Sequence, residues 1–371
     1  MVVVNTLLIV GTTLIVFGST ICWCNPLQDK TLELVVTVFR HGDRTNDKAT
    51  TYPKDPYINQ TYFPYGYGEL TNKGKMRLYK LGSTFRNMYN QFLGRLYLPG
   101  LISPLSTDYS RTKNSLQLFL AGLFPPDRTL LEWNNAINWN PIAFNYVSFQ
   151  NNRELSFPSF YCPRFVLLLE EYKQSPEYLY LENQYNQLYG YVSQNTGLNV
   201  TSLFSLFGLY FGLTTEKEFG LKLPEWTKTV YPEYLEKAAA DNYRTFTATP
   251  QLNQLFGGFL LKKTIKDMVR KINGEPNQPK MYIYSAHEIS VVSILGALNL
   301  YYPHVPNYGA SVILELHNIN QKRYIKVLYN KNKFDKFFYL KIPGCNVICP
   351  FEDFLTLVAK NIPADGDPCL L

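Results

Sequence analysis

The stretch LELVVTVFRHGDRTN, residues 32–46, contains the pattern that decides the fold. Seven mostly apolar strand-forming residues run directly into Arg40, His41 and Arg44, three nitrogen-rich side chains within five positions. A continuous apolar run of this length is typical of a strand that is buried on both faces, as in a parallel sheet. Because buried cations need a partner, the cluster that ends this strand requires either an anionic ligand or full solvation.

A second strand with charged residues at its end lies more than 240 residues further along the chain. The sequence MYIYS at 281–285 has strand character, and it is followed at once by His287, Glu288 and a helical pattern of apolar residues. In open α/β sheets, ligand sites form at the carboxyl ends of the strands. If the two strands are neighbours, both histidines, Glu288 and the two arginines share one site.

A third polar segment, SPLSTDYSRTKNSL at 103–116, places Arg111 where a helix is expected to begin. A helix N-terminus combined with a guanidinium is a suitable binding site for an anion. Taken alone, an arginine at the start of a helix is more often a solvated surface residue. We expect Asp43 and Asp108 to orient these loops through hydrogen bonds.

Helical periodicity predicts two helices in the first third of the chain. Thr71 is the expected N-cap of the first helix, whose apolar residues recur at spacings of three and four. The second helix is expected from about residue 112 to 124, where two consecutive prolines stop it. Alternating apolar residues predict a hairpin at about 311–329.

The distribution of these elements predicts an α/β fold in which helices flank a mainly parallel sheet. The core domain is expected to comprise residues 28–130 and 246–371. Residues 131–245 are rich in tyrosine, are interrupted by proline and contain mainly helix-like stretches. We interpret this segment as a helical cap inserted into the core.

Composition limits the classes of function. The chain has 371 residues, of which 46% are hydrophobic, so it can bury a large core and does not resemble a disordered protein. Its net charge of +7 comes without a long run of lysine or arginine, so no nucleic-acid partner is expected. The charge is compatible with small anionic molecules or surfaces.

The first 24 residues contain no Lys, Arg, Asp or Glu, and an apolar stretch from Leu7 to Phe17 precedes three small residues. This pattern predicts a secretory signal peptide at 1–24, with an uncleaved membrane anchor as the alternative. No other stretch is long and apolar enough to cross a bilayer. After signal removal, the chain is therefore expected to make no stable membrane insertion.

Removal of the signal leaves an even set of cysteines: Cys162, Cys345, Cys349 and Cys369. Two disulfides are expected in an oxidising compartment. Cys345 and Cys349 are close enough to staple a tight turn, which leaves the other pair to pin the C-terminal tail. A zinc site is the alternative, but no histidine lies near these cysteines in the sequence. The sequons at Asn59 and Asn199 are compatible with glycosylation.

Several dispersed motifs resemble the histidine acid phosphatase family, in particular its prostatic, lysosomal and insect-venom members. From about residue 33 to residue 369 these motifs are FRHGDRT, PYGYGELTNKG, STDYSRT, LFPP, YCPRF, YSAHE and PGCNVICPFEDF, followed by the tail Cys369. The resemblance implies the phosphoglycerate-mutase-like fold and two disulfides that coincide with the pairs above. A third pair of the prostatic branch has no counterpart here. No metal or other cofactor is implied.

The resemblance also implies a role for each site residue. His41 corresponds to the nucleophile that forms a phosphohistidine intermediate, and Glu288 lies where the family places its proton donor. The residues that correspond to phosphate-binding groups are Arg40, Arg44, Arg111 and His287. Neighbouring guanidiniums should lower the pKa of His41 and keep its imidazole neutral and nucleophilic in acid.

Two positions depart from the common family pattern. Glu288 stands where most members have Asp, so the carboxyl reaches one methylene further. Asn46 stands where many members have Pro, which predicts a less rigid loop just beyond the phosphate-binding residues. The remaining histidines, His304 and His317, have no motif support and are given no role.

These observations predict a secreted acid phosphatase, with the lysosome as an alternative location. Its substrate would be a small phosphomonoester or a phosphoprotein, and the sequence is compatible with a homodimer without deciding the oligomeric state. Two other functions remain open. One is a phytase-like inositol polyphosphate phosphatase, and the other is a salivary or venom-type binding protein with weak or no turnover.

Overall fold

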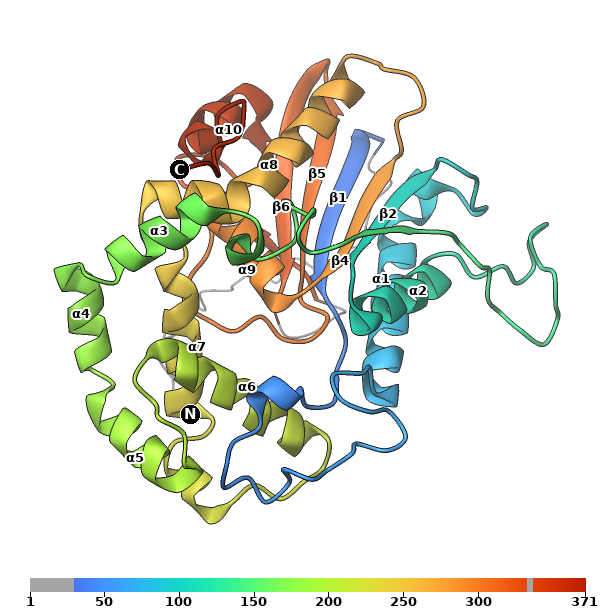
Figure 1. The fold of residues 1–371 in the computed structure, drawn as a ribbon. Coiled ribbons are helices and arrows are strands. Elements are labelled where there is room, and N and C mark those ends of the chain that lie inside the picture. The colour runs from blue at the N-terminus through green and yellow to red at the C-terminus, as the bar shows by residue number, and fades with distance from the viewer. Residues whose placement is uncertain (1–29, 332–335) are drawn as a thin grey trace, which may run out of the picture.

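The computed structural model describes residues 30–331 and 336–371, so the predicted signal peptide at 1–24 lies outside the described residues. An eight-stranded sheet forms the centre of the molecule (Figure 1), with the order β3-β2-β4-β1-β5-β6-β7 and β8 paired to β6. The strands are β1 (Leu32–Arg40), β2 (Ile102–Thr107), β3 (Asn145–Val147), β4 (Met281–Ala286), β5 (Ser311–Ile319), β6 (Lys322–Asn330), β7 (Phe338–Leu340) and β8 (Cys349–Pro350). The predicted fold class is confirmed.

Strand β1 has a parallel neighbour on one side and an antiparallel neighbour on the other. It pairs with β4 in a parallel register that brings Arg40 opposite Ala286, and it pairs with β5 in an antiparallel register. The backbone N–H of His41 donates to the Ala286 carbonyl at 3.0 Å. The two strands therefore end side by side, as their sequence patterns predicted.

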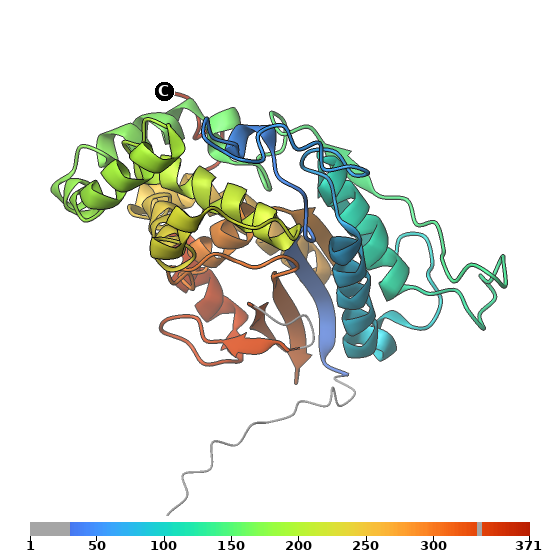
Figure 2. The ribbon, with the colours of Figure 1, turned by 90° about the horizontal axis from the view of Figure 1, so that it is seen from below.

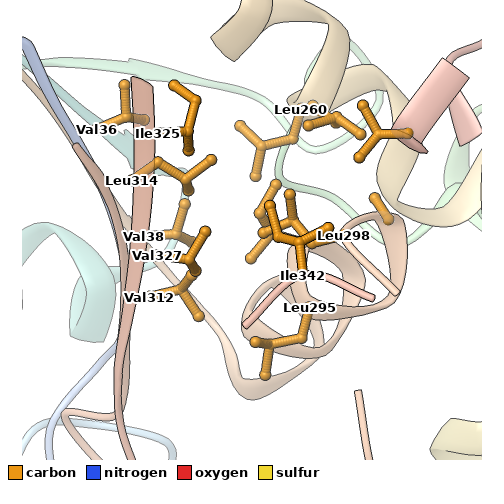
Figure 3. Packing of buried hydrophobic residues seen from close by; sticks show 14 of the residues in the cluster. Val36, Val38, Leu260, Leu295, Leu298, Val312, Leu314, Ile325, Val327 and Ile342 are labelled. Atoms are coloured by element: carbon orange, nitrogen blue, oxygen red, sulfur yellow. The ribbon is translucent and has the colours of Figure 1, made fainter. Parts of the chain in front are cut away.

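The alternating side chains of β1 divide the core into two layers. Val36 and Val38 pack toward α8 (Pro250–Ile272) and α9 (Glu288–Ala297), as Figure 3 shows for the residues it labels. Val35 and Phe39 point to the opposite face, which α1 (Asn72–Leu93) and α2 (Ser110–Leu123) cover. Burial on both faces explains why β1 is a continuous apolar run.

The predicted N-cap of α1 is confirmed. The Thr71 side chain accepts a hydrogen bond from the Gly74 backbone N–H at 3.2 Å, which satisfies one of the free donors of the first turn. Gly74 also lies against the loop that follows β1, because a Cβ on Gly74 would come within 2.2 Å of the Asp43 carbonyl oxygen. Only glycine allows this approach of helix and loop.

Five helices follow one another in the green and yellow part of Figure 1: α3 (Pro163–Tyr172), α4 (Pro176–Asn183), α5 (Asn186–Thr196), α6 (Leu203–Glu218) and α7 (Glu233–Thr245). They bury a separate apolar cluster that also takes in the start of α8, so the cap packs onto the core. In Figure 2 these helices lie along one end of the sheet.

The first part of the predicted insertion differs from a helical cap. Residues 131–162, all of them described, contain no α-helix, and β3 within them pairs in parallel with β2 as an edge of the core sheet. The elements that complete the fold are α10 (Phe351–Val358), η1 (Lys48–Thr50), η2 (Pro158–Phe160), η3 (Glu225–Thr229) and η4 (Ala359–Asn361). Within the described ranges, none of the helices combines the length and apolar character that a membrane span requires.

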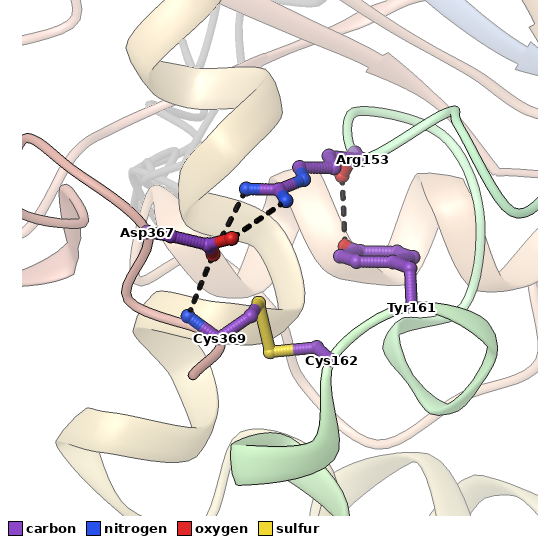
Figure 4. The surroundings of a disulfide bond; sticks show 5 residues. All are labelled: Arg153, Tyr161, Cys162, Asp367 and Cys369. Carbon is purple, nitrogen blue, oxygen red and sulfur yellow. Dashed lines mark hydrogen bonds and ion pairs between the residues drawn. A yellow bond between two sulfur atoms is a disulfide. The ribbon is translucent and has the colours of Figure 1, made fainter. Parts of the chain in front are cut away.

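Both cysteine pairs are disulfides in the structure, so the zinc alternative has no support. Cys345 and Cys349 are separated by 4 positions, and Cys162 and Cys369 by 207. Figure 4 shows that the second bridge is reinforced by Asp367, which pairs with Arg153 at 3.0 Å and accepts from the Cys369 backbone N–H at 3.1 Å.

Removal of the two disulfides is expected to have unequal effects on stability. Replacing Cys162 and Cys369 by serine should lower the free energy of unfolding by about 5 kcal/mol, because the bridge closes a long loop, whereas replacing Cys345 and Cys349 should cost about 2 kcal/mol. Urea unfolding of the two double variants measures the difference. Equal losses would contradict the loop-length argument.

Candidate active site

His41 lies at the carboxyl end of β1 and is 1% exposed. Its Nδ1 lies 2.8 Å from the Gly42 carbonyl oxygen. Since a carbonyl can only accept, Nδ1 carries the proton and the lone pair of the neutral ring is on Nε2. The loop geometry therefore prepares one specific nitrogen of His41 for nucleophilic attack.

The strand pairing brings His287 and Glu288 to His41. The ring centroids of His41 and His287 are 5.4 Å apart, and Glu288 Oε2 lies 3.3 Å from Arg40 Nε. His287 is the N-cap residue of α9, where the free backbone N–H groups favour a nearby anion. The predicted meeting of the two strand ends is thus present in the structure.

Arg44 and Arg111 complete the cationic side of the site, and Asp47 connects them. Asp47 Oδ2 lies 3.1 Å from Arg44 Nη1, and Asp47 Oδ1 lies 3.7 Å from Arg111 Nη1. Arg111 is in the first turn of α2, as the sequence predicted. Asp47 was not predicted as a site residue, although an acidic side chain three positions after Arg44 could have indicated an ion-pair partner for that arginine.

Burial and charge act together on the two imidazoles. Burial, followed by the nearby guanidiniums and His287, lowers the pKa of His41 well below its ordinary value. The pKa of His287 is lowered by burial and by the same three arginines. The predicted direction for His41 is correct, but burial contributes more than the guanidiniums on which the prediction was based.

The lowered pKa of His41 should be visible in the pH dependence of catalysis. Because the pKa of His41 in the folded protein lies well below 6.5, kcat/KM for p-nitrophenyl phosphate should not fall as the pH decreases through 6.5. The stability of the fold, in contrast, should decrease in this range, because the unfolded chain binds this proton at a higher pH than the folded chain, so stability is lost as pH falls below 6.5. An acid limb with an apparent pKa near 6.5 would contradict a buried, neutral nucleophile.

Residues of the loop at 301–310 hold Arg40 in place. Arg40 is 3% exposed, its Nη1 donates to the Pro306 carbonyl at 2.7 Å, and its guanidinium carbon lies 3.9 Å from the centre of the Tyr308 ring. These contacts orient Arg40 beside Glu288. No periodicity or motif in this loop indicated such a role.

Two further tyrosines were not predicted as site residues: Tyr243 lies outside the motifs, whereas Tyr109 lies within STDYSRT, two positions before Arg111. Tyr243 on α7 is completely buried, and burial together with Glu288 raises its pKa well above the ordinary value, so its hydroxyl keeps its proton. Tyr109 lies between the Arg111 guanidinium, 4.8 Å from the ring centre, and the His287 ring at 4.9 Å. The cap and the α2 segment thus each add an aromatic wall to the site.

The predicted orienting role of Asp43 has a clear structural counterpart. Asp43 is 2% exposed, receives hydrogen bonds from Arg77 Nε at 2.5 Å and Nη2 at 3.1 Å, and pairs with Lys73 at 3.1 Å. These bonds fasten the loop to α1. Asp108 instead pairs with Lys113 at 2.9 Å.

The two histidines without an assigned role make structural contacts. His304 Nδ1 lies 2.7 Å from the Tyr302 carbonyl oxygen and its Nε2 lies 2.7 Å from the Tyr329 hydroxyl. His317 Nε2 lies 3.1 Å from Glu315. These contacts explain the burial of both rings without a catalytic role.

The expectation of a less rigid loop at Asn46 is wrong. Asn46 is completely buried, and its Oδ1 accepts from the Asp47 backbone N–H at 3.0 Å and from the Thr50 hydroxyl at 2.5 Å. Its Nδ2 donates to Glu216 Oε1 on α6 at 3.3 Å. Three side-chain hydrogen bonds therefore hold Asn46 in place. A proline at this position would restrict the backbone through its ring but could not form these hydrogen bonds.

His41, His287 and Glu288 are also the described residues that could hold a metal ion, since one ligand atom from each lies within 4.8 Å of the others. The adjacent guanidiniums of Arg40 and Arg111 would repel a divalent cation and attract an anion. The site is therefore better suited to phosphate, and the absence of a metal requirement stays a prediction.

Three guanidiniums and two neutral imidazoles at the carboxyl edge of an α/β sheet define a class of phosphate-handling enzymes. The chain belongs to the histidine phosphatase superfamily (branch 2), whose family model matches residues 31–330. The predicted resemblance to this family is confirmed. Members of this family are phosphoric ester hydrolases, so the protein is an enzyme of the acid phosphatase type.

The chain is similar to the venom acid phosphatase of Apis mellifera, with 40% identity over 340 residues that cover 91% of this chain and 87% of that protein. It is 33% identical to the lysosomal acid phosphatase of Homo sapiens over 344 residues, covering 92% and 80% of the two chains. A solved phytase from Klebsiella has a TM-score of 0.65 at 16% identity, covering 92% of this chain and 99% of that one. The last likeness shows the fold alone.

Proposed function

We propose that the enzyme hydrolyses phosphate monoesters in two steps through a phosphohistidine on Nε2 of His41. The observation that carries this proposal is the orientation of His41: Nδ1 is occupied by the Gly42 carbonyl, which leaves an unprotonated Nε2 among guanidiniums. A neutral imidazole nitrogen is a nucleophile, and the surrounding cations bind the group it attacks.

In the first step, Nε2 of His41 forms a bond to phosphorus while the ester P–O bond breaks. The protonated carboxyl of Glu288 gives its proton to the leaving oxygen. In the second step, water attacks phosphorus, Glu288 accepts the water's proton, and the P–N bond breaks to release phosphate. Arg40, Arg44 and Arg111 stabilise the charge on the equatorial oxygens in both steps.

The neighbours of Glu288 support its assignment as the proton donor. Its carboxyl lies 3.3 Å from Arg40, on the side of the site that His287 and α9 define. The protonated hydroxyl of Tyr243 is a further neighbour that can orient the carboxyl. The methylene that Glu288 adds relative to Asp is thus accommodated by partners on both the core and the cap.

Simple phosphomonoesters or phosphoproteins are better supported as substrates than inositol polyphosphates. A polyphosphate needs free cations beyond the first phosphate, whereas three of the cations beside this loop are already paired: Lys73 and Arg77 with Asp43, and Lys113 with Asp108. A binding protein without turnover would not need a neutral buried histidine among three arginines, whereas an enzyme uses it as the nucleophile. We therefore favour turnover of monoesters.

Phosphate release from p-nitrophenyl phosphate, glycerol phosphate, phosphotyrosine and phytate at pH 5 tests the proposal. Monoesters should be hydrolysed faster than phytate. Quenching the reaction in alkaline detergent should trap a phosphorylated chain. Its protein-bound phosphate label should be stable in base and lost in acid, as expected of phosphohistidine. A label that survives acid would rule out His41 as the phosphorylated group.

We further propose that the protein is secreted or delivered to the lysosome as a glycosylated chain. Support comes from the names of its venom and lysosomal relatives, from the two disulfides, and from the exposed positions of Asn59 and Asn199. Expression in insect cells, followed by mass measurement before and after glycosidase treatment, tests both points. The mass of the same sample in native conditions tests whether the chain forms a homodimer.

A further inference from the structure

Behind the phosphate-binding loop lies a buried polar cluster to which the proposed reaction assigns no task. Glu216 on α6 is 0% exposed, Asp55 is 4% exposed, and Tyr52 and Tyr62 are each 1% exposed. Each of the four has one side-chain oxygen without a hydrogen-bond partner among the described residues. Leaving buried polar atoms unpaired is costly, so such a cluster calls for a specific explanation.

The cluster is connected to the loop through a single amide. Glu216 Oε1 accepts from Asn46 Nδ2 at 3.3 Å, while Asn46 Oδ1 accepts from the backbone N–H of Asp47 at 3.0 Å. The backbone carbonyl of Asn46 also accepts from the Gly68 N–H at 2.8 Å. Asn46 therefore contacts the cap helix α6 through its side chain and Gly68 through its backbone carbonyl.

Asp47 continues the connection to the phosphate-binding groups. Its two carboxylate oxygens lie 3.1 Å from Arg44 and 3.7 Å from Arg111. A Cβ on Gly68 would come within 2.4 Å of Asp47 Oδ1, so glycine at that position leaves room for this carboxylate. Contacts thus run without interruption from Glu216 through Asn46 and Asp47 to two guanidiniums.

The surroundings of Glu216 favour its neutral form. Burial raises its pKa to about 8, Asp55 adds to the increase, and the Asn46 hydrogen bond opposes it. The groups facing it are Asp55, Tyr52 and Tyr62, and burial together with Glu216 raises the pKa of both tyrosines, so they stay neutral. In acid, a protonated Glu216 can donate to the unpaired Asp55 oxygen and still accept from Asn46.

We propose that Glu216 is a positioning residue of the phosphatase site, which sets Arg44 and Arg111 for phosphate through Asn46 and Asp47. This inference rests on the proposed function, because it assumes that the two arginines bind phosphate. Ionised Glu216 would face the Asp55 carboxylate and disturb Asn46, so phosphate affinity should weaken as the pH rises through about 8.

Binding of inorganic phosphate to the full chain, measured by calorimetry from pH 5 to 9, tests the inference in three proteins. The wild type should lose affinity about tenfold between pH 6.5 and 9. Glu216→Gln, which keeps a neutral acceptor for Asn46 and a donor for Asp55, should retain its affinity at pH 5 and change less than about threefold over the range. Glu216→Leu should bind phosphate about tenfold more weakly at every pH.

Glu315→Gln is the matched control, because Glu315 is a buried carboxyl on β5 that contacts Tyr89 and His317 rather than the loop. It should leave the phosphate affinity and its pH dependence unchanged. In Asn46→Ala, the further change Glu216→Leu should add little, since both act through one connection.

An identical alkaline loss of affinity in the wild type and Glu216→Gln would overturn the inference. Wild-type affinity in Glu216→Leu would do the same. If Glu216→Leu fails to fold by circular dichroism, the pH comparison with Glu216→Gln still decides. Since phosphate binding is measured without turnover, a failure of the His41 assignment would appear separately, as unchanged turnover in His41→Ala.

Discussion

Replacing His41 by alanine is expected to lower kcat for p-nitrophenyl phosphate at least about 10³-fold, because the reaction loses the atom that attacks phosphorus. The three arginines and His287 do not depend on the imidazole for their positions, since Arg40 is held by Pro306 and Arg44 by Asp47. Inorganic phosphate should therefore still bind the variant. Steady-state kinetics and phosphate calorimetry on the same preparation measure both effects.

His304→Ala is the matched control for this experiment. His304 is also a buried histidine whose pKa burial lowers, to about 4, but its partners are Tyr302 and Tyr329. Its removal should lower the melting temperature and leave kcat of the folded fraction near the wild-type value. Equal rates from the wild type and His41→Ala would exclude His41 as the nucleophile.

Replacing Glu288 by glutamine is expected to have the second-largest effect, and the effect should depend on the leaving group. Hydrolysis of an alkyl phosphate such as glycerol phosphate should slow by about 10²- to 10⁴-fold, because an alkoxide cannot leave without a proton. Hydrolysis of p-nitrophenyl phosphate should slow much less, since its phenolate is a good leaving group. The measurement is kcat/KM for both substrates in both proteins, because kcat/KM reports the phosphorylation step and not the shared hydrolysis of the phosphohistidine.

Glu288 also forms an ion pair with the buried Arg40, so the two roles must be separated. Loss of the ion pair alone would slow both substrates equally, and that outcome would contradict the proton-donor assignment. Glu33→Gln provides a control, because Glu33 pairs with Arg323 at 2.8 Å at the other end of β1. That change should leave both rates unaltered.

The sequence predicted the parts of the site that depend on periodic elements. A doubly buried strand reads as an unbroken apolar run, and parallel strands end at the same edge, so Arg40, His41, His287 and Glu288 could be brought together without a structure. Cysteine spacing likewise predicted both disulfides. These inferences needed only local patterns and one rule for how strands assemble.

Two of the residues that were not predicted, Tyr308 and Tyr243, lie outside the quoted motifs. Tyr308 is in an irregular loop and Tyr243 is on a cap helix, and their relation to the site depends on tertiary packing. The three-residue strand β3 is too short to show alternation. Asn46 was judged from local chain stiffness, whereas its hydrogen bond to Glu216, 170 positions away, decides how firmly it is held.

The disulfide between Cys162 and Cys369 also imposes an order on synthesis. After Cys162 is made, 207 further positions must be translated before its partner exists, which takes on the order of 10 to 40 seconds at ribosomal rates. During that interval Cys345 and Cys349 are produced first and offer Cys162 wrong partners. Efficient production of the enzyme therefore requires a compartment that both oxidises thiols and reshuffles mispaired ones.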